Sequence, residues 1–450
     1  MSVVLPKEIN YSRPASLPEG TQCNSIVSSP INGSIFTGGS QIIQFDMVQR
    51  GYLVPESMYL RYKFGATLAG AVVTTTIRGT PVYTPFARLE TIVGAQVVES
   101  IQNYNQLCNM LVNCRMNYAQ KVGVASLFGY SSVGTVAVLP PQVATDFAFN
   151  LSTSAPNGYS YNTSPAGTYY NFMSAPIGCI LSNADNLIPL KFMPSCRIQL
   201  TTDTIANMFG SSANVTNYTL SNVELCYDVI EFNPMVDQAI SSIAGGQITI
   251  KSQSYLSSGV TAGAGSSGTL EFLFNQRLAS IKSLYLHLSA THATAVNGMF
   301  DSLDITGSLL TLPGTTGGDY QFFVGGIPYP PRPMSTILNK AGILSELSES
   351  FGPIHDLLTT NFSIAPMEFS FGNTATTTQC QMGKFYIGTN VEKLSTNNAL
   401  LTGISSQGSP ISVRISIGTV TTNAQTIQLI CSYDALLQVD IVNRALIVLQ

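Results

Sequence analysis

The chain has 450 residues, of which only 10% are Asp, Glu, Lys or Arg, whereas its apolar fraction of 45% is ordinary. Its formal net charge is −4 and it contains no run of basic residues, which argues against a protein whose main task is to bind nucleic acid. The length allows two domains of roughly 200 residues, each with its own core. A surface with so little charge suits a chain that packs against copies of itself.

The N-terminal segment contains several prolines (Pro6, Pro14, Pro18 and Pro30) and few periodic apolar positions. This composition predicts an extended N-terminal arm over residues 1–35. Charged residues and prolines interrupt the segment from Met1 to Pro30, so we do not expect a secretory signal. No stretch approaches the ~18 unbroken apolar residues of a membrane span. We therefore expect the chain to fold in the cytoplasm.

One strand pattern occurs twice. Residues 43–45 alternate apolar and polar side chains, and a second apolar run follows at 59–64; the same order returns at 270–272 and 285–288. The offset from 43 to 270 is nearly equal to the offset from 59 to 285. Period-2 strands dominate both halves, which is typical of β-sandwiches rather than of alternating strands and helices. The sequence thus predicts one β-rich domain that is duplicated in tandem.

A few helices interrupt the strands. Val97, Ile101, Tyr104, Cys108 and Leu111 are spaced by four and three residues in turn, which predicts one amphipathic helix of about five turns. A second helix is predicted at about 335–350, where apolar residues share one face: Ile337, Ala341, Leu344, Leu347 and Phe351.

A short helix is predicted to join the two halves. Asn233 and Pro234 form a helix start, and Gly245 and Gly246 supply its end. We therefore expect a first domain at 36–233, a linker helix at 234–246 and a second domain at 247–450.

The eight cysteines are scattered and include no C-x-x-C pair. Most lie in apolar strand patterns, as do Cys226 and Cys431. We expect buried, reduced thiols that act as small apolar side chains, and no zinc site.

No group of residues in the sequence forms a convincing motif for catalysis, cofactor binding or metal binding. Residues 263–268 match G-x-G-x-x-G, but a strand pattern follows where a dinucleotide site needs a helix. His287 lies in a strand pattern and His355 in a loop after a predicted helix, so we interpret His287, His292 and His355 as structural. The acidic pair Asp301 and Asp304 is interpreted as a turn. We predict no catalytic, cofactor-binding or metal site, and not an enzyme.

Several segments, in this order along the chain, resemble those of the double jelly-roll major capsid proteins, and most closely those of virophages and polinton-like viruses. They are residues 59–64, 88–90, 98–107, 188–190, 218–228, 277–284 and 326–330. The resemblance implies an all-β fold of two tandem eight-stranded jelly-roll β-sandwiches with a few short interpolated helices. It covers roughly residues 35 to 450.

The resemblance also implies a function. In that family three chains form a pseudo-hexagonal homotrimer, or capsomer, and capsomers tile the facets of an icosahedral shell. It implies as partners neighbouring capsomers, a penton protein and minor or cement proteins, and capsids of this lineage often enclose an internal membrane. It implies no cofactor and no sequence-specific nucleic-acid binding, synthesis in the host cytoplasm and a final location in the virion. The arm would lie along the inner capsid surface.

A second hypothesis is a secreted or cell-surface tandem β-sandwich, an adhesin or carbohydrate-binding protein. That hypothesis predicts a signal peptide and paired cysteines, and the sequence shows neither pattern. An enzyme is the third hypothesis and the least supported by the residues.

Overall fold

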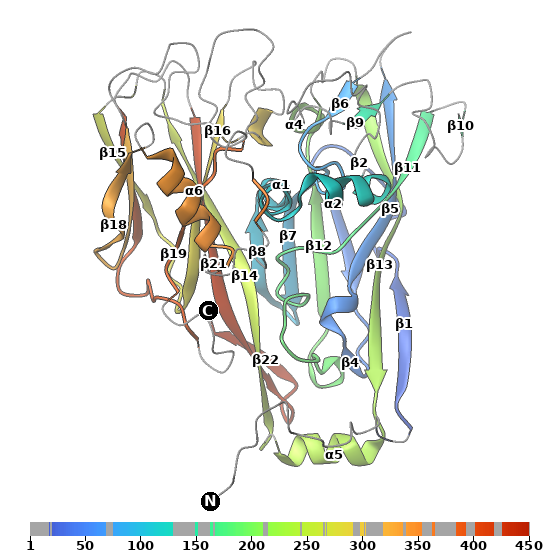
Figure 1. Cartoon of the computed structure of the whole chain (residues 1–450). Coiled ribbons are helices and arrows are strands. Elements are labelled where there is room, and N and C mark those ends of the chain that lie inside the picture. The colour runs from blue at the N-terminus through green and yellow to red at the C-terminus, as the bar shows by residue number, and fades with distance from the viewer. Residues whose placement is uncertain are drawn as a thin grey trace, which may run out of the picture.

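The structure is a computed structural model of the chain. It describes all residues except 1–17, 19, 69–74, 129–148, 152–162, 165–166, 210–214, 244, 264–265, 267, 291–297, 301, 303–317, 336–338, 353–361, 365–383, 393–400, 418–424 and 450. Figure 1 shows two β-sandwiches that stand side by side with their long strands upright.

The first sandwich consists of two facing antiparallel sheets. One sheet has the order β1 (Gln22–Ser28), β13 (Val215–Glu231), β5 (Tyr59–Leu68), β11 (Gly167–Ser174) and β10 (Thr163–Ser164), and β2 (Ile35–Thr37) and β4 (Tyr52–Leu53) also pair with β13. The other has the order β3 (Ile42–Asp46), β12 (Cys196–Thr202), β7 (Phe86–Val93) and β8 (Gln96–Gln102). A small separate sheet joins β6 (Thr75–Ile77) to β9 (Phe149–Leu151).

The second sandwich repeats this plan. Its first sheet has the order β14 (Gln247–Ala262), β21 (Gln425–Asp440), β16 (Ile281–Ala290) and β19 (Ile387–Asn390), and β22 (Ala445–Leu449) also pairs with β21. Its other sheet has the order β15 (Gly268–Phe274), β20 (Ile411–Ile417), β17 (Asp319–Val324) and β18 (Ile327–Ser335).

Eight strands of the first sandwich correspond in order to eight strands of the second. Strands β1, β13, β5 and β11 match β14, β21, β16 and β19, and strands β3, β12, β7 and β8 match β15, β20, β17 and β18. The repeated pattern falls on matching strands, because residues 43–45 lie in β3 and residues 270–272 in β15, while Tyr59 begins β5 and Tyr285 lies in β16. Eight strands in two facing sheets of this order make a jelly roll. The predicted duplication of an all-β domain is confirmed.

The helices are short and lie between strands. They are α1 (Tyr104–Arg115), α2 (Tyr118–Gly123), α3 (Ala125–Phe128), α4 (Ile205–Met208), α5 (Pro234–Ile243) and α6 (Lys340–Glu349), with one-turn 3-10 helices η2 (Pro55–Ser57), η3 (Leu190–Phe192) and η5 (Gly298–Phe300).

The prediction that a helical face begins at Val97 is wrong. Val97 and Ile101 belong to β8, which pairs with β7 across a tight turn, and Asn103 has a left-handed φ of 50° immediately before α1. The ladder to β7 therefore outweighs the local helical spacing, and the helix starts only at Tyr104. In α6, Ile343 and Leu347 are buried whereas Ala341 of the predicted stripe is exposed.

The predicted arm over residues 1–35 is wrong for residues 22–28. These residues form β1 and pair along their whole length with β13, with Ser25 opposite Asp228. Short-range patterns did not reveal this strand because its side chains alternate only between exposed and half-buried positions. Residues 1–17 lie outside the described part of the chain.

Alternating burial builds the cores. Strand β12 alternates buried and half-buried side chains without a break, so one of its faces packs into the first sandwich. Aromatic rings contact one another there: Phe64 stacks on Phe172 at a centroid distance of 5.6 Å and on Tyr218 at 5.9 Å. In the core of the second sandwich, Leu284, Leu286 and Leu288 of β16 are all fully buried.

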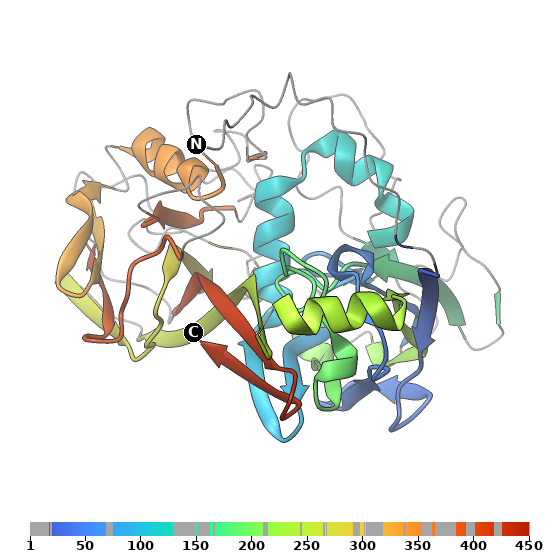
Figure 2. The ribbon, with the colours of Figure 1, turned by 90° about the horizontal axis from the view of Figure 1, so that it is seen from below.

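Helix α5 joins β13 to β14 at the base of the molecule. Figure 2, viewed from below, shows α5 lying across the base beside the β21–β22 hairpin. Asp237 anchors the helix through an ion pair with Lys191 and a 3.1 Å hydrogen bond from Tyr52 Oη. A helix is therefore present at the predicted linker position.

Candidate assembly interface

The two sandwiches meet along β8 and β14, and Glu99 of β8 lies at the centre of this contact. Its carboxylate accepts hydrogen bonds from the Ile180 backbone N–H at 2.9 and 3.1 Å, from Thr91 Oγ1 at 2.9 Å and from Ser254 Oγ of β14. The side chain is buried, with 3% exposed. One carboxylate thus joins three segments, two from the first sandwich and one from the second.

Burial gives Glu99 an unusual protonation equilibrium. Desolvation raises the pKa of Glu99 from its ordinary 4.5 to about 7, and the hydrogen bonds from Ser254, Ile180 and Thr91 limit the rise. Cys179 and Tyr433 are the other titratable groups that act on this site, and burial raises the pKa of each. The contact between the sandwiches therefore contains one acid that titrates near neutral pH.

Backbone groups extend the contact on both sides of Glu99. Ser252 Oγ donates to the Ile180 carbonyl at 2.5 Å, and Asn183 Nδ2 donates to the Gln253 carbonyl at 3.0 Å. The Asp185 N–H donates to the Lys251 carbonyl, also at 3.0 Å. These bonds run between β14 and the loop after β11, so the outer edge of β14 is satisfied by irregular backbone rather than by a neighbouring strand.

Helix α1 forms a second part of the contact, towards the upper half of Figure 1. Asn109 accepts from Thr80 Oγ1 at 3.0 Å and donates to the Phe300 carbonyl at 3.2 Å. Asn113 donates to Tyr386 Oη at 3.2 Å, and the Cys114 carbonyl accepts from the Ser363 N–H at 2.7 Å. All three partners belong to the second half of the chain: Phe300, Tyr386 and Ser363. Hydrogen bonds from α1 therefore connect the two sandwiches.

The contact is made by side chains and loops, because β8 and β14 belong to different sheets and have no ladder register. Buried hydrogen bonds of this kind contribute little net free energy each, but an unmatched partner costs about 1–3 kcal/mol. The polar groups therefore specify one relative placement of the two sandwiches.

Of the candidate residues for chemistry, His287 is described by the structure. His287 is buried, lies 3.4 Å from Gln428 Oε1, and burial lowers its pKa to about 4, so it is neutral at neutral pH. His292, His355, Asp301 and Asp304 lie outside the described residues, as does part of the glycine-rich loop. Among the residues that the structure describes, no group of three or more His, Cys, Asp or Glu could hold a metal ion.

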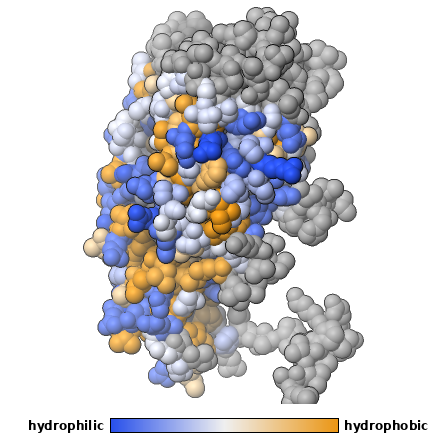
Figure 3. Space-filling view, turned by 90° about the vertical axis from the view of Figure 1, so that its left-hand side faces the viewer, coloured by the Kyte–Doolittle hydropathy of each residue, from blue (hydrophilic) through white to orange (hydrophobic). Residues whose placement is uncertain are grey.

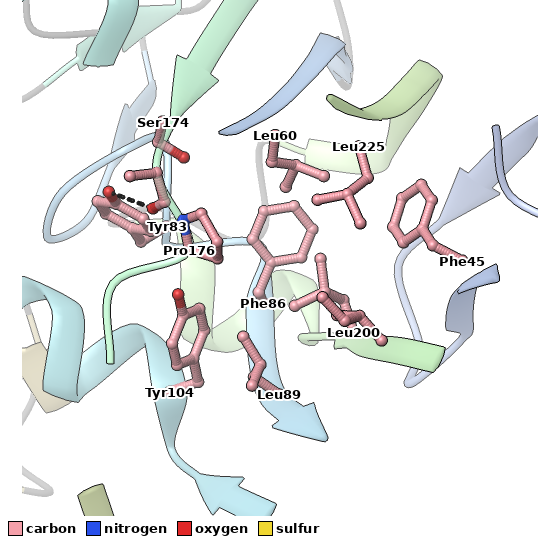
Figure 4. A pocket seen from close by; sticks show the side chains of 12 residues that line it. Phe45, Leu60, Tyr83, Phe86, Leu89, Tyr104, Ser174, Pro176, Leu200 and Leu225 are labelled. Atoms are coloured by element: carbon pink, nitrogen blue, oxygen red, sulfur yellow. Dashed lines mark hydrogen bonds between the residues drawn. The ribbon is translucent and has the colours of Figure 1, made fainter. Parts of the chain in front are cut away.

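One small apolar cavity lies inside the first sandwich. Figure 4 shows aromatic and aliphatic side chains around it, among them Phe45, Phe86 and Tyr104. Its volume is about 10 Å3, which is at the lower limit for one water molecule. Tyr104 Oη is buried without a hydrogen-bond partner in the described part of the molecule. The cavity is too small for a substrate and is a packing feature.

The described cysteines are free thiols. Cys226 and Cys431 are buried, as predicted, with Cys108, Cys114, Cys179 and Cys196. Burial raises the pKa of Cys114 and Cys196 to about 12, so these thiols are unreactive. Cys23 of β1 is exposed. None of the described helices is long and apolar enough to cross a membrane.

Comparison with known proteins identifies the fold. No protein-family model and no curated protein matches the sequence. Among solved structures, the major capsid protein of Faustovirus is similar over 97% of this chain and 92% of its own, with a TM-score of 0.61 and 11% identity. The mavirus major capsid protein is similar over 100% of this chain and 95% of its own, with a TM-score of 0.54 and 10% identity.

A chain in the structure of the Sputnik virophage is similar over 100% of this chain and 92% of its own, with a TM-score of 0.53 and 10% identity. At such identities the likeness concerns the fold. The chain therefore has the double jelly-roll fold, in which both sandwiches and their mutual placement are shared with these proteins.

Proposed function

We propose that this chain is a viral major capsid protein whose trimers tile the facets of an icosahedral shell. The observation that carries the proposal is the extent of the structural likeness. It covers 97% of this chain and 92% of the Faustovirus major capsid protein, so both sandwiches and the contact between them are included. A chance likeness of single β-sandwiches would leave one half of the chain unmatched.

The properties of the surface support the same role. Only 10% of the residues are charged, so charge repulsion between neighbouring copies is weak. Among the described residues there is no group of three or more His, Cys, Asp or Glu that could hold a metal ion. We propose a structural role without catalysis, in the virion, with neighbouring capsomers, a penton protein and cement proteins as partners.

The test is the oligomeric state of the purified chain. Size-exclusion chromatography with light scattering should give three times the chain mass of 48.0 kDa, and electron micrographs should show particles with six lobes. Stable trimers with six lobes would support the capsomer. A chain that stays monomeric at micromolar concentration, or that becomes disulfide-linked after secretion, would contradict it and favour the adhesin.

A further inference from the structure

Strand β22 forms an open edge of its sheet. Its residues pair with β21, from Ala445 opposite Asp440 to Leu449 opposite Leu436, and β14 occupies the other edge of β21 over the same residues. Among the strands that the structure describes, β22 pairs with β21 alone. The backbone groups on its outer side therefore remain available to a further strand.

The side chains of β22 are also partly uncovered. Ile447 is 50% exposed and Leu449 is 51% exposed, and the two share one face because strand residues two apart point the same way. Figure 3 faces the left-hand side of Figure 1 and shows apolar side chains across the lower half of the molecule, the height at which Figure 1 places β22. An edge strand with exposed apolar side chains is a site where an extended segment can add.

The first sandwich contains an edge that is covered in this way. Leu53 of β4 exchanges backbone hydrogen bonds with Ile188, at 2.8 and 3.1 Å, and both residues are fully buried. Ile188 lies outside the named strands and is followed by Pro189. A residue before a proline favours an extended backbone. A short apolar segment that ends at a proline can thus cover the edge of a short strand.

The segment before β1 starts at the base of the molecule, as β22 does. Gln22 pairs with Glu231 at the end of β13, and Gly20 lies beside Asn233 at the start of α5. Beyond the other end of α5, Gly246 lies beside Val442 in the turn between β21 and β22. Helix α5 therefore connects the place where residues 1–17 join the described chain to the place where β22 begins.

Residues 6–19 are long enough to follow this route. Helix α5 has a length of about 15 Å and β22 a length of about 17 Å, whereas an extended segment of this size reaches about 46 Å. The route passes Met235 and Val442, which are 77% and 79% exposed. These are the highest values among the large apolar side chains that the structure describes. A segment on this route would cover them as well.

Residues 2–5 have the composition of a short edge strand. They are Ser-Val-Val-Leu, and Pro6 follows them. Valine favours strands, and Pro6 favours an extended Leu5 and offers no N–H to continue a ladder. An apolar residue followed by a proline is also the pattern of Ile188 and Pro189. The segment thus matches the open edge of β22 in length and in apolar character.

We propose that residues 2–5 add as a strand to the outer edge of β22 in the same chain. The added strand runs antiparallel to β22, because along the chain Leu5 is nearer than Ser2 to the base, where β22 begins. Its apolar side chains lie beside Ile447 and Leu449, and its backbone bonds to the outer side of β22. The contact lies within one chain and does not depend on the trimer of the proposed function.

Hydrogen exchange in a peptide over residues 443–450 measures this cover. The amides of β22 that do not bond to β21 should exchange at least about tenfold more slowly in the wild type than in Leu5→Asp, because a carboxylate is costly on an apolar face. Ser12→Asp is the matched control, since it adds the same charge to the same segment outside residues 2–5, and it should exchange like the wild type. Equal rates in the wild type and Leu5→Asp would overturn the proposal.

Cross-linking shows which segment covers the edge. In a Cys23→Ser background, which removes the exposed thiol of β1, Val4→Cys and Ile447→Cys are joined by a short bis-maleimide reagent. The expected product on a denaturing gel has the mass of one chain, 48.0 kDa, with the two peptides linked. Val4→Cys with Leu273→Cys is the control pair, because Leu273 is exposed on β15, and it should give no link within the chain.

Three other results would overturn the proposal. Links between chains only would assign the edge to residues 2–5 of another copy, and the absence of any link would leave the edge without this segment. Slow exchange of β22 only after addition of phosphatidylglycerol vesicles would assign the edge to lipid. Light scattering on the same variants reports the trimer separately, so each of these results would leave the proposed capsomer intact.

Discussion

Strands β8 and β18 occupy the same position in their sheets but differ in what covers them. The buried Glu99 of β8 is hydrogen-bonded to β14 of the same chain, whereas β18 has four prolines and exposes Ile327, Pro331 and Arg332. An exposed strand edge invites uncontrolled pairing, and prolines prevent it. The edge that is covered within the chain has a buried polar network, whereas the prolines of the exposed edge β18 protect it from pairing with another strand.

The matching strands β5 and β16 differ at one buried position. Tyr62 of β5 contacts Phe86 and Phe172 edge to face at 5.4 and 5.5 Å, and its hydroxyl donates to the Val82 carbonyl at 2.7 Å. At the matching place in β16, Leu288 is fully buried without a polar group. At this position the first sandwich has directional aromatic contacts and the second has an aliphatic side chain.

The largest expected effect comes from the aromatic core. Phe64→Ala removes a fully buried ring that stacks on Phe172 and Tyr218, and should lower the free energy of unfolding by about 3–5 kcal/mol. Chemical denaturation measures the change. Met173→Ala on the exposed face of β11 is the control and should have little effect. Equal losses in the two variants would contradict an aromatic core.

The next effect is the pH dependence of the internal contact. Because the folded-state pKa of Glu99 is about 7 and the ordinary value is 4.5, stability from this group is fully present below pH 4.5 and is lost as the pH rises to about 7. The loss is about 3 kcal/mol. Glu99→Gln mimics the protonated acid and should remove this component. Chemical denaturation from pH 4 to pH 8 should give the two proteins similar free energies of unfolding in acid and a lower value for the wild type in base. Free energies that depend on pH in the same way in both proteins would refute the assignment.

A smaller effect is expected at the hydrogen bonds between α1 and the second sandwich. Asn109→Ala leaves the Thr80 hydroxyl and the Phe300 carbonyl without this partner, which should cost about 1–3 kcal/mol. The second readout is limited proteolysis, which should cut between the sandwiches sooner than in the wild type. Asn171→Ala on an exposed strand position is the matched control. Identical digestion of both variants would show that Asn109 does not hold the sandwiches together.

The smallest effect concerns the outer faces of the sheets. Arg61 pairs with Glu224 in the first sandwich, and Arg414 lies 3.7 Å from Glu271 in the second, and all four side chains are substantially exposed. Exposed pairs are screened by water and salt. Arg61→Ala and Arg414→Ala should therefore leave the denaturation midpoint unchanged within error at high salt. A clear loss there would mean that these faces are covered in the protein as purified.

Local patterns predicted the features that depend on neighbouring residues. Alternation at 43–45 and 270–272 indicated matching strands because side chains on a strand alternate between faces, and Asn233-Pro234 marked the start of α5 because proline fits the first turn of a helix. The burial of Cys226 and Cys431 followed from their apolar neighbours in the same strands.

Features that depend on distant segments could not be read in this way. Strand β1 exists because β13, at the far end of the first sandwich's sequence, offers it a partner, and Val97 lies in a strand because β7 pairs with β8. No local pattern in the sequence marks Glu99 as buried, because its burial depends on the approach of Ser254 and Ile180. Backbone ladders and desolvation act between segments that folding brings together, so the sequence determined the repeated strands, and the tertiary structure decided which edges they share and which acid lies between them.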